Sequence, residues 1–249
     1  MSNIDFLLTS GCSFTEGGGM DSPTMMRELG YDIPEHHTDT KYLRDEFRWS
    51  NVVGNHFGCE SVNLSISGHS NDFIRRSIIK YIEENKEKLS KLKNKVCIIQ
   101  ASFPHRFNFE YEEQPQPYAF TPQHCPSFDD KEYADELETF YKIYLKHIFD
   151  SKRFIEYYYY EVLGLFSYLK ENGFYSYIIF YDDEFKSIEN KFNNIIKFNG
   201  ENLQHFTAET HKERFCDVID WTSDTHFTPN GNKLIANEII RFLDDKNIF

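Results

Sequence analysis

The chain has 249 residues, a length that fits one large domain and leaves ample room for a buried core. Lys and Arg number 27 against 40 Asp and Glu, so the formal net charge is −13, which disfavours binding to a phosphate backbone and makes nucleic acid an unexpected partner. The 24 Phe and 16 Tyr, with 27% charged residues, supply enough core material to exclude wholesale disorder.

The cysteines and the apolar segments indicate in which cellular compartment the protein is expected. The five cysteines are scattered without a C-x-x-C pair, so neither a disulfide framework nor a structural zinc site is expected. His36-His37 has no carboxylate or cysteine spaced to complete a metal site. No segment reaches the about 18 apolar residues of a membrane span, and Ile4–Leu8 is too short for the core of a signal peptide. We therefore expect a cytoplasmic protein without a membrane partner.

The first part of the chain alternates predicted strands and helices. In chain order, apolar runs and helical spacing predict a strand at Ile4–Thr9, a glycine-rich loop at Cys12–Ser22, a helix at Arg48–Phe57, a strand at Ser61–Leu64, a helix at Asn71–Tyr81 and a strand at Val96–Ala101. The stretch Glu83–Lys95 between the last two is charged and is expected to be solvated.

The second part begins with an irregular segment, Phe103–Asp130, which is rich in proline, glutamine and aromatic residues. A loop of this length inside a compact domain is usually functional or partly disordered. We expect one domain over residues 1–249, with an irregular insertion at about 103–132. The following elements are then predicted: a helix at Tyr133–Asn172 broken near Asp150-Ser151, a strand at Tyr175–Tyr181, a loosely specified polar stretch at Asn190–Asn202, a short strand at Phe215–Ile219, and a closing helix from Thr228-Pro229 to about Leu243.

The alternation of strands and helices predicts an α/β fold, a three-layer α/β/α sandwich with a mainly parallel sheet. In such a sheet, functional groups collect at the carboxyl ends of the strands. Small, nucleophilic or titratable residues gather in four segments that follow strands or precede the last helix: Gly11–Thr15, Asn63–Ser70, Ala101–Arg106 and Asp224–Gly231.

These segments contain the residue types of nucleophilic catalysis. A hydroxyl needs a base to become a nucleophile, and the base needs an orienting group, roles that Ser13, His226 and Asp224 can fill. A developing oxyanion needs preorganised N–H donors, for which the amides of Ser13 and Gly68 are candidates.

Three of the segments resemble motifs of the SGNH (GDSL-type) hydrolases. Gly11-Cys12-Ser13-Phe14 resembles the first block of that family, with Cys12 where the family often has Asp, and Asn63 through Gly68 is similar to the second block. Asp224-Thr225-His226-Phe227-Thr228-Pro229-Asn230-Gly231 resembles the last block. Their order and spacing match the family, so the resemblance extends over nearly the whole chain.

The resemblance implies a fold and a mechanism. It implies a flavodoxin-like sandwich of about five parallel strands, with no metal or organic cofactor. It also implies that Ser13 is the nucleophile, His226 the base and Asp224 the residue that orients His226. Gly68, within the block that begins at Asn63, is implied to help hold the oxyanion.

Two departures from the family pattern affect the expected site. The third block is usually Gly-x-Asn-Asp, but here the strand runs into Gln100-Ala101-Ser102-Phe103 without Asn, so either Ser102 replaces that donor or the oxyanion hole has one donor fewer. The last block has Asp-x-His where Asp-x-x-His is commoner, which makes Asp224 a weaker assignment than His226.

The predicted function is that of an ester hydrolase working through an acyl-enzyme, with an O-acetyl or other short acyl ester of a carbohydrate as the expected substrate. Arg106 either anchors an anionic substrate or pairs with one of the many acidic residues. Two other functions stay open: a catalytically inactive binding or assembly module, and an acyltransferase that uses the same Ser and His. The sequence indicates neither an oligomeric state nor a protein partner.

Overall fold

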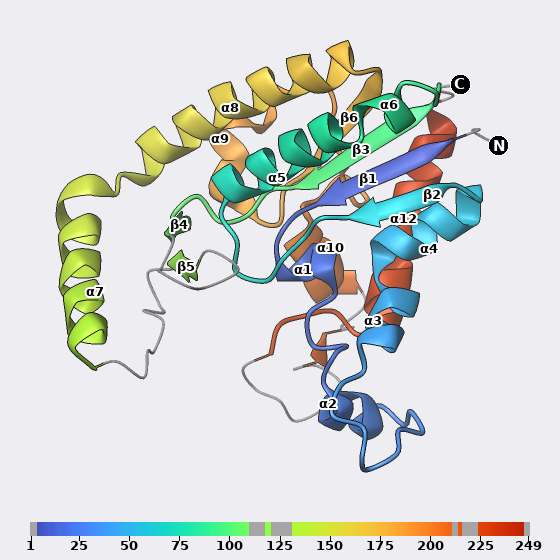
Figure 1. Ribbon diagram of the computed structural model, residues 1–249, viewed down its shortest axis with the longest axis horizontal. Coiled ribbons are helices and arrows are strands. Elements are labelled where there is room, and N and C mark those ends of the chain that lie inside the picture. The colour runs from blue at the N-terminus through green and yellow to red at the C-terminus, as the bar shows by residue number, and fades with distance from the viewer. Residues whose placement is uncertain (1–3, 110–117, 121–130, 211–213, 216–223, 247–249) are drawn as a thin grey trace.

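The computed structural model has a parallel sheet with helices on both of its faces (Figure 1). It describes residues 4–109, 118–120, 131–210, 214–215 and 224–246. The predicted three-layer α/β/α sandwich is thereby confirmed.

The sheet has the strand order β2-β1-β3-β6, and each pairing is parallel. Its strands are β1 (Phe6–Ser10), β2 (Glu60–Asn63), β3 (Lys95–Gln100) and β6 (Phe174–Ile179). Each begins and ends within two residues of its predicted position. Largely apolar runs mark the buried strands β1, β3 and β6, whereas β2 is polar and only partly buried. Leu8 lies opposite Val62 of β2 and Cys97 of β3, a register that brings the carboxyl ends of these strands to one edge.

A fifth strand is reduced to a single contact in the part of the chain that the structure describes. Ile195 forms an isolated parallel bridge with Ile178, although the resemblance implies about five strands. The predicted strand at Phe215–Ile219 lies outside the described residues from 216 onward, and just before it Arg214 forms an isolated antiparallel bridge with Phe227. The polar composition of Asn190–Asn202 explains why no longer strand forms there.

Alternate strand residues face two separate cores, because successive side chains of a strand point to opposite faces. On one face, Phe6 and Leu8 pack against α5 (Asn71–Glu84) and α8 (Ser151–Glu171). On the other face, Leu7 packs against α4 (Trp49–Phe57) and α12 (Pro229–Asp245). Both faces of the sheet are therefore covered (Figure 1).

The remaining helices are short and lie mostly in the loops that join these elements. They are α1 (Ser13–Glu16), α2 (Pro23–Glu28), α3 (Lys41–Phe47), α6 (Lys86–Leu89), η2 (Asp183–Phe185), α9 (Lys186–Glu189) and α10 (Leu203–Thr210). Two of these helices, α1 and α6, differ from the sequence predictions. The loop predicted at Cys12–Ser22 contains a helical turn at α1, and the stretch predicted as solvated at Glu83–Lys95 buries Leu89 of α6.

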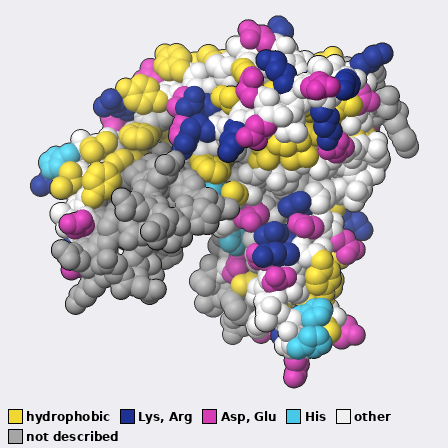
Figure 2. Space-filling view, viewed as in Figure 1, with side chains coloured by type: hydrophobic (Ala, Val, Ile, Leu, Met, Phe, Trp, Pro, Cys, Tyr) yellow, Lys and Arg dark blue, Asp and Glu magenta, His cyan; other side chains and the backbone are white. Residues whose placement is uncertain are grey.

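The break predicted in the long helix is present. The chain runs from α7 (Lys131–Ile143) through a π-helical segment, η1 (Tyr144–Ile148), to α8, and Asp150 caps α8 through its side chain. The preceding insertion contains an antiparallel pair of short strands, β4 (Phe107–Phe109) and β5 (Tyr118–Phe120), and its residues 110–117 and 121–130 are outside the described part. Hydrophobic side chains gather along α8 on the face in Figure 2, and those of Tyr157, Tyr160 and Leu163 are exposed.

The closing helix ties the end of the chain to its first third. Thr228 is the N-cap of α12, as predicted, and its hydroxyl accepts a hydrogen bond from the Gly231 amide at 3.2 Å. The Asn232 side chain accepts a hydrogen bond from the Trp49 amide at 3.1 Å and donates to the carbonyls of Phe227 and Thr228. This buried network fixes the segment that contains His226 against α4. No helix among the described residues is both long enough and apolar enough to cross a membrane.

Candidate active site

Ser13 opens the helical turn that follows β1. The Ser13 carbonyl accepts hydrogen bonds from the amides of Gly17 at 2.9 Å and Gly18 at 2.8 Å, and Gly17 ends the turn with φ of 93°, a value that favours glycine. Gly11 precedes the turn because a Cβ there would lie 2.5 Å from Thr15 Oγ1. The Ser13 residue is 5% exposed.

His226 and Asp224 form a close pair at the other end of the chain. Asp224 Oδ1 accepts hydrogen bonds both from the His226 amide and from His226 Nδ1, each at 2.8 Å. The Asp-x-His spacing permits this, because the carboxylate can reach the backbone and the ring of the residue two positions later. Burial acts to raise the Asp224 pKa, but the two hydrogen bonds outweigh it and the pKa lies below its usual value.

The imidazole of His226 lies against the first loop. A Cβ added to Gly18 would lie 2.8 Å from His226 Cδ2 and 2.9 Å from Nε2, and the ring centroids of His226 and Phe14 are 5.1 Å apart. The structure therefore brings His226 to the turn that contains Ser13, from more than 200 residues away. No hydrogen bond joins Ser13 Oγ to His226 in the described structure, so the two side chains must approach each other before a proton can pass between them.

The loop after β2 presents Gly68 to the same edge of the sheet. Gly68 has φ of 77°, and its amide makes no hydrogen bond to a described residue, which leaves the N–H available to a ligand. The neighbouring Ser67 amide donates to Glu16 Oε2 at 2.6 Å, and Arg44 donates to Glu16 Oε1 at 3.0 Å. Glu16, which we did not single out from the sequence, thus joins this loop to α1.

Asn63 has its side chain fully engaged within the protein. Its Nδ2 donates to the Thr15 carbonyl at 2.8 Å and to Ser50 Oγ at 2.9 Å, and its Oδ1 accepts from the Ser65 amide at 2.8 Å. Because both ends of the amide are occupied, Asn63 holds the loop after β2 against α1, and it has no free donor for a ligand.

Ser102 is likewise part of an internal network. Its hydroxyl donates to the His69 carbonyl at 2.7 Å, and Asn71 bonds both its amide and its carbonyl, at 2.7 and 2.8 Å. The single hydroxyl proton is therefore already used, and the side chain is not free to replace the missing Asn of the third block. The network instead joins the loop after β3 to the start of α5.

Arg106 extends from this network toward α8. Its Nη1 donates to Ser102 Oγ at 3.2 Å, and the guanidinium carbon lies 4.7 Å from the centroid of the Phe103 ring. Arg106 also lines a pocket of about 200 Å³ with Asp72 and Glu161, so two carboxylates share this pocket with the guanidinium. Arg106 forms no salt bridge within the described part of the chain, and Asp72 and Glu161 both lie within salt-bridge distance of Arg75, so both alternatives for Arg106 stay open.

Gln100, the last residue of β3, forms hydrogen bonds to the helical turn that begins at Ser13. Thr15 Oγ1 donates to Gln100 Oε1, and Gln100 Nε2 donates to Cys12 Sγ at 3.6 Å. The buried amide of Gln100 therefore satisfies groups on both sides of Ser13. Among the described residues, no group of three or more His, Cys, Asp or Glu side chains is arranged to hold a metal ion.

The fold is similar to those of solved esterases. The psychrotrophic esterase EstA from Pseudoalteromonas sp. superimposes with a TM-score of 0.50 at 10% identity, covering 97% of each chain. A carbohydrate esterase family 2 enzyme from Corynascus thermopiles gives 0.48 at 10% identity, covering 98% of this chain and 68% of its own. The acetyl xylan esterase Est2A from Butyrivibrio proteoclasticus gives 0.47 at 9% identity, covering 97% and 64%.

These likenesses are structural only. Neither the protein-family models nor the curated proteins include a match to this sequence. At 10% identity, the match to EstA over the full length of both chains establishes a shared fold. The likeness therefore extends to the fold that the three short motifs predicted, and it is shared with a solved esterase.

Proposed function

We propose that the chain is a serine ester hydrolase in which Ser13 is the nucleophile, His226 the general base and Asp224 its orienting group. The observation that carries this proposal is the Asp224–His226 hydrogen bond of 2.8 Å, on an imidazole packed against Gly18 in the turn that begins at Ser13. A bond from Nδ1 to a carboxylate fixes the tautomer that leaves Nε2 free to accept a proton.

The mechanism proceeds in two steps. His226 Nε2 takes the Ser13 proton as Oγ attacks the ester carbonyl, and the same proton passes to the departing alcohol as the acyl–oxygen bond breaks. Water then gives a proton to Nε2 and attacks the acyl-enzyme, which releases the acid and restores Ser13. The amides of Ser13 and Gly68 are the proposed donors to the oxyanion, and the engaged Ser102 hydroxyl leaves the site one donor short of the family pattern.

The proposed substrate is a short acyl ester of a carbohydrate. Aromatic rings continue outward from the candidate site: Phe14 stacks on Tyr181 at 4.2 Å, and Phe103 meets Tyr181 edge-on at 5.7 Å. Phe103 is partly exposed, and aromatic side chains offer a flat apolar surface with directional edges to the faces of a ligand ring. The shielded position of Ser13 favours a small acyl group.

A second candidate is a non-catalytic binding module with the same fold. It is favoured by the near-complete burial of Ser13, the missing hydrogen bond to His226 and the engaged Ser102 hydroxyl. An inactive protein would retain the Asp224–His226 pair only as a structural contact.

One experiment separates the two candidates. Purified protein is assayed for p-nitrophenyl acetate turnover and for labelling by a fluorophosphonate, with the labelled peptide identified by mass spectrometry. We expect turnover and a label on Ser13, both lost in Ser13→Ala and both kept in the control Ser187→Ala, which alters an exposed serine of α9. A folded wild-type protein that neither turns over ester nor takes the label would support the binding module instead.

A further inference from the structure

The outer edge of β6 is open over most of its length. Ile178 turns its backbone outward, because its amide donates to the Asn194 carbonyl and its carbonyl accepts from the Ile196 amide, both at 2.9 Å. Strand residues two apart point their backbone groups the same way, so the amide and carbonyl of Ser176 also face outward. They make no hydrogen bond to any described residue.

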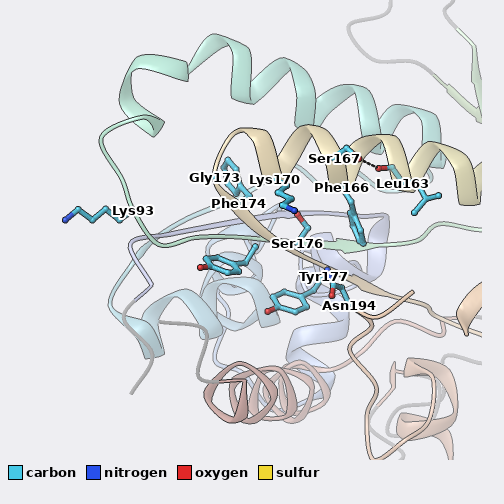
Figure 3. A pocket seen from close by; sticks show the side chains of 11 residues that line it. Lys93, Leu163, Phe166, Ser167, Lys170, Gly173, Phe174, Ser176, Tyr177 and Asn194 are labelled. Atoms are coloured by element: carbon cyan, nitrogen blue, oxygen red, sulfur yellow. Dashed lines mark hydrogen bonds between the residues drawn. The ribbon is translucent and has the colours of Figure 1, made fainter. Parts of the chain in front are cut away.

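A groove of about 750 Å³ runs beside this edge. Figure 3 shows its lining side chains spread along β6, with Phe166 and Lys170 from α8 on one side and Asn194 near the far end. The Ser176 side chain lines the groove, and its hydroxyl is buried without a hydrogen-bond partner. An unpaired amide, carbonyl and hydroxyl therefore occur together on a residue that is 6% exposed.

The charge of the groove is opposite to that of the chain. Lys93 and Lys170 are the charged residues in its described lining, which contains no Asp or Glu, although the chain as a whole has a net charge of −13. Neither ammonium group forms a salt bridge to a described residue. The Asp5 carboxylate accepts a hydrogen bond from the backbone amide of Lys93 at 2.9 Å, and it interacts with the Lys93 ammonium only electrostatically. Two lysines without a salt bridge, in a groove whose described lining has no carboxylate, favour an anionic occupant.

We propose that the outer edge of β6 binds an extended segment of a partner protein, which adds to the sheet as a further strand and carries acidic side chains. Backbone pairing at Ser176 would satisfy its amide and carbonyl, and carboxylates of the segment would reach Lys93 and Lys170. The segment is short, because residues 194–196 already close the edge at Ile178. A second copy of this chain fits poorly, since two molecules of charge −13 would repel and would bring the same lysines together.

A displayed library of random heptapeptides tests the proposal. The library is selected on the wild-type chain and counter-selected on Ser176→Pro, in which proline removes the outward amide at a position that an edge strand tolerates. We expect the enriched peptides to be acidic, and fluorescein-labelled copies to bind the wild type at least about tenfold more tightly than Ser176→Pro or the double variant Lys93→Glu/Lys170→Glu. The matched control Lys233→Glu alters an exposed lysine of α12 and should bind like the wild type.

Three binding results and one sedimentation result would overturn the proposal. Circular dichroism first establishes that each variant is folded, and the charge-reversal variant leaves the strand itself unchanged. Enrichment of no peptide, enrichment of peptides without acidic residues, or equal binding to Ser176→Pro would each refute an acidic strand at this edge. Sedimentation that shows a dimer lost in Ser176→Pro would assign the edge to a second copy of the chain.

Discussion

At the scale of single residues, the proposed mechanism depends on the carboxylate of Asp224. Asp224→Asn keeps the shape of the side chain, but an amide that donates to Nδ1 would move the proton to Nε2 and block its role as a base. We expect kcat for p-nitrophenyl acetate to fall by about 10²- to 10⁴-fold, with a smaller change in KM. An activity within twofold of the wild type would show that the Asp224–His226 bond has only a structural role.

A substitution at Gly18 tests whether the observed position of the His226 ring is needed for activity. Gly18 lacks the positive φ of its neighbours, so Gly18→Ala is compatible with the backbone, but the new methyl group would lie within 3 Å of the His226 ring and displace it. We expect ester turnover to drop by about tenfold or more, while the protein stays folded. The control is Gly164→Ala in the middle of α8, where nothing lies within 4 Å of the added methyl group. That change should leave turnover intact and raise stability by about 0.5–1 kcal/mol.

At the scale of elements, residue patterns along the chain predict the helices and strands, but they do not predict the hydrogen bonds that join loops distant in sequence. The buried strands and α12 were predictable because β3 is a continuous apolar run and Thr228-Pro229 is a helix start. The bonds between Asn71 and Ser102 join residues 31 positions apart, and those of Glu16 to Ser67 join residues 51 apart. No periodicity marks such pairs. The sequence therefore left open whether Ser102 replaces the missing donor, and the structure shows that its hydroxyl donates to the His69 carbonyl within the protein.

The Asn71–Ser102 connection makes a prediction about stability. Asn71→Leu would leave the amide and carbonyl of Ser102 without their partner in a buried setting. We expect the free energy of unfolding to fall by about 2–3 kcal/mol, measured by urea denaturation, because unsatisfied buried groups incur a desolvation penalty. The comparison is Asn85→Ala at the other end of α5, which loses one local bond to the Tyr81 carbonyl and should lose less than about 1 kcal/mol. Equal losses would mean that the connection adds nothing beyond an ordinary side-chain bond.

At the scale of the whole molecule, the fold assembles its candidate site from the two ends of the chain. The turn at Ser13 follows the first strand, whereas His226 precedes the last helix, and the Trp49–Asn232 bond holds these regions together across 183 positions. Contacts between distant parts of the chain form late in folding, and they are lost together when the core unfolds. The candidate site should therefore lose activity in the same transition as global unfolding.

His105 makes that transition dependent on pH. Burial, and to a lesser degree the neighbouring charge of Arg106, lower the pKa of His105 from 6.5 to about 4, and its ring stacks on Phe103 at 5.5 Å. Because the unfolded chain binds this proton near pH 6.5 and the folded chain does not, the stabilisation is fully present above pH 6.5 and is lost as the pH falls toward 4. His105→Phe keeps an aromatic ring and removes the titration. We expect the urea midpoint of the wild type to fall more steeply than that of His105→Phe across this window. Parallel curves would contradict the assignment, because carboxylates elsewhere contribute equally to both proteins.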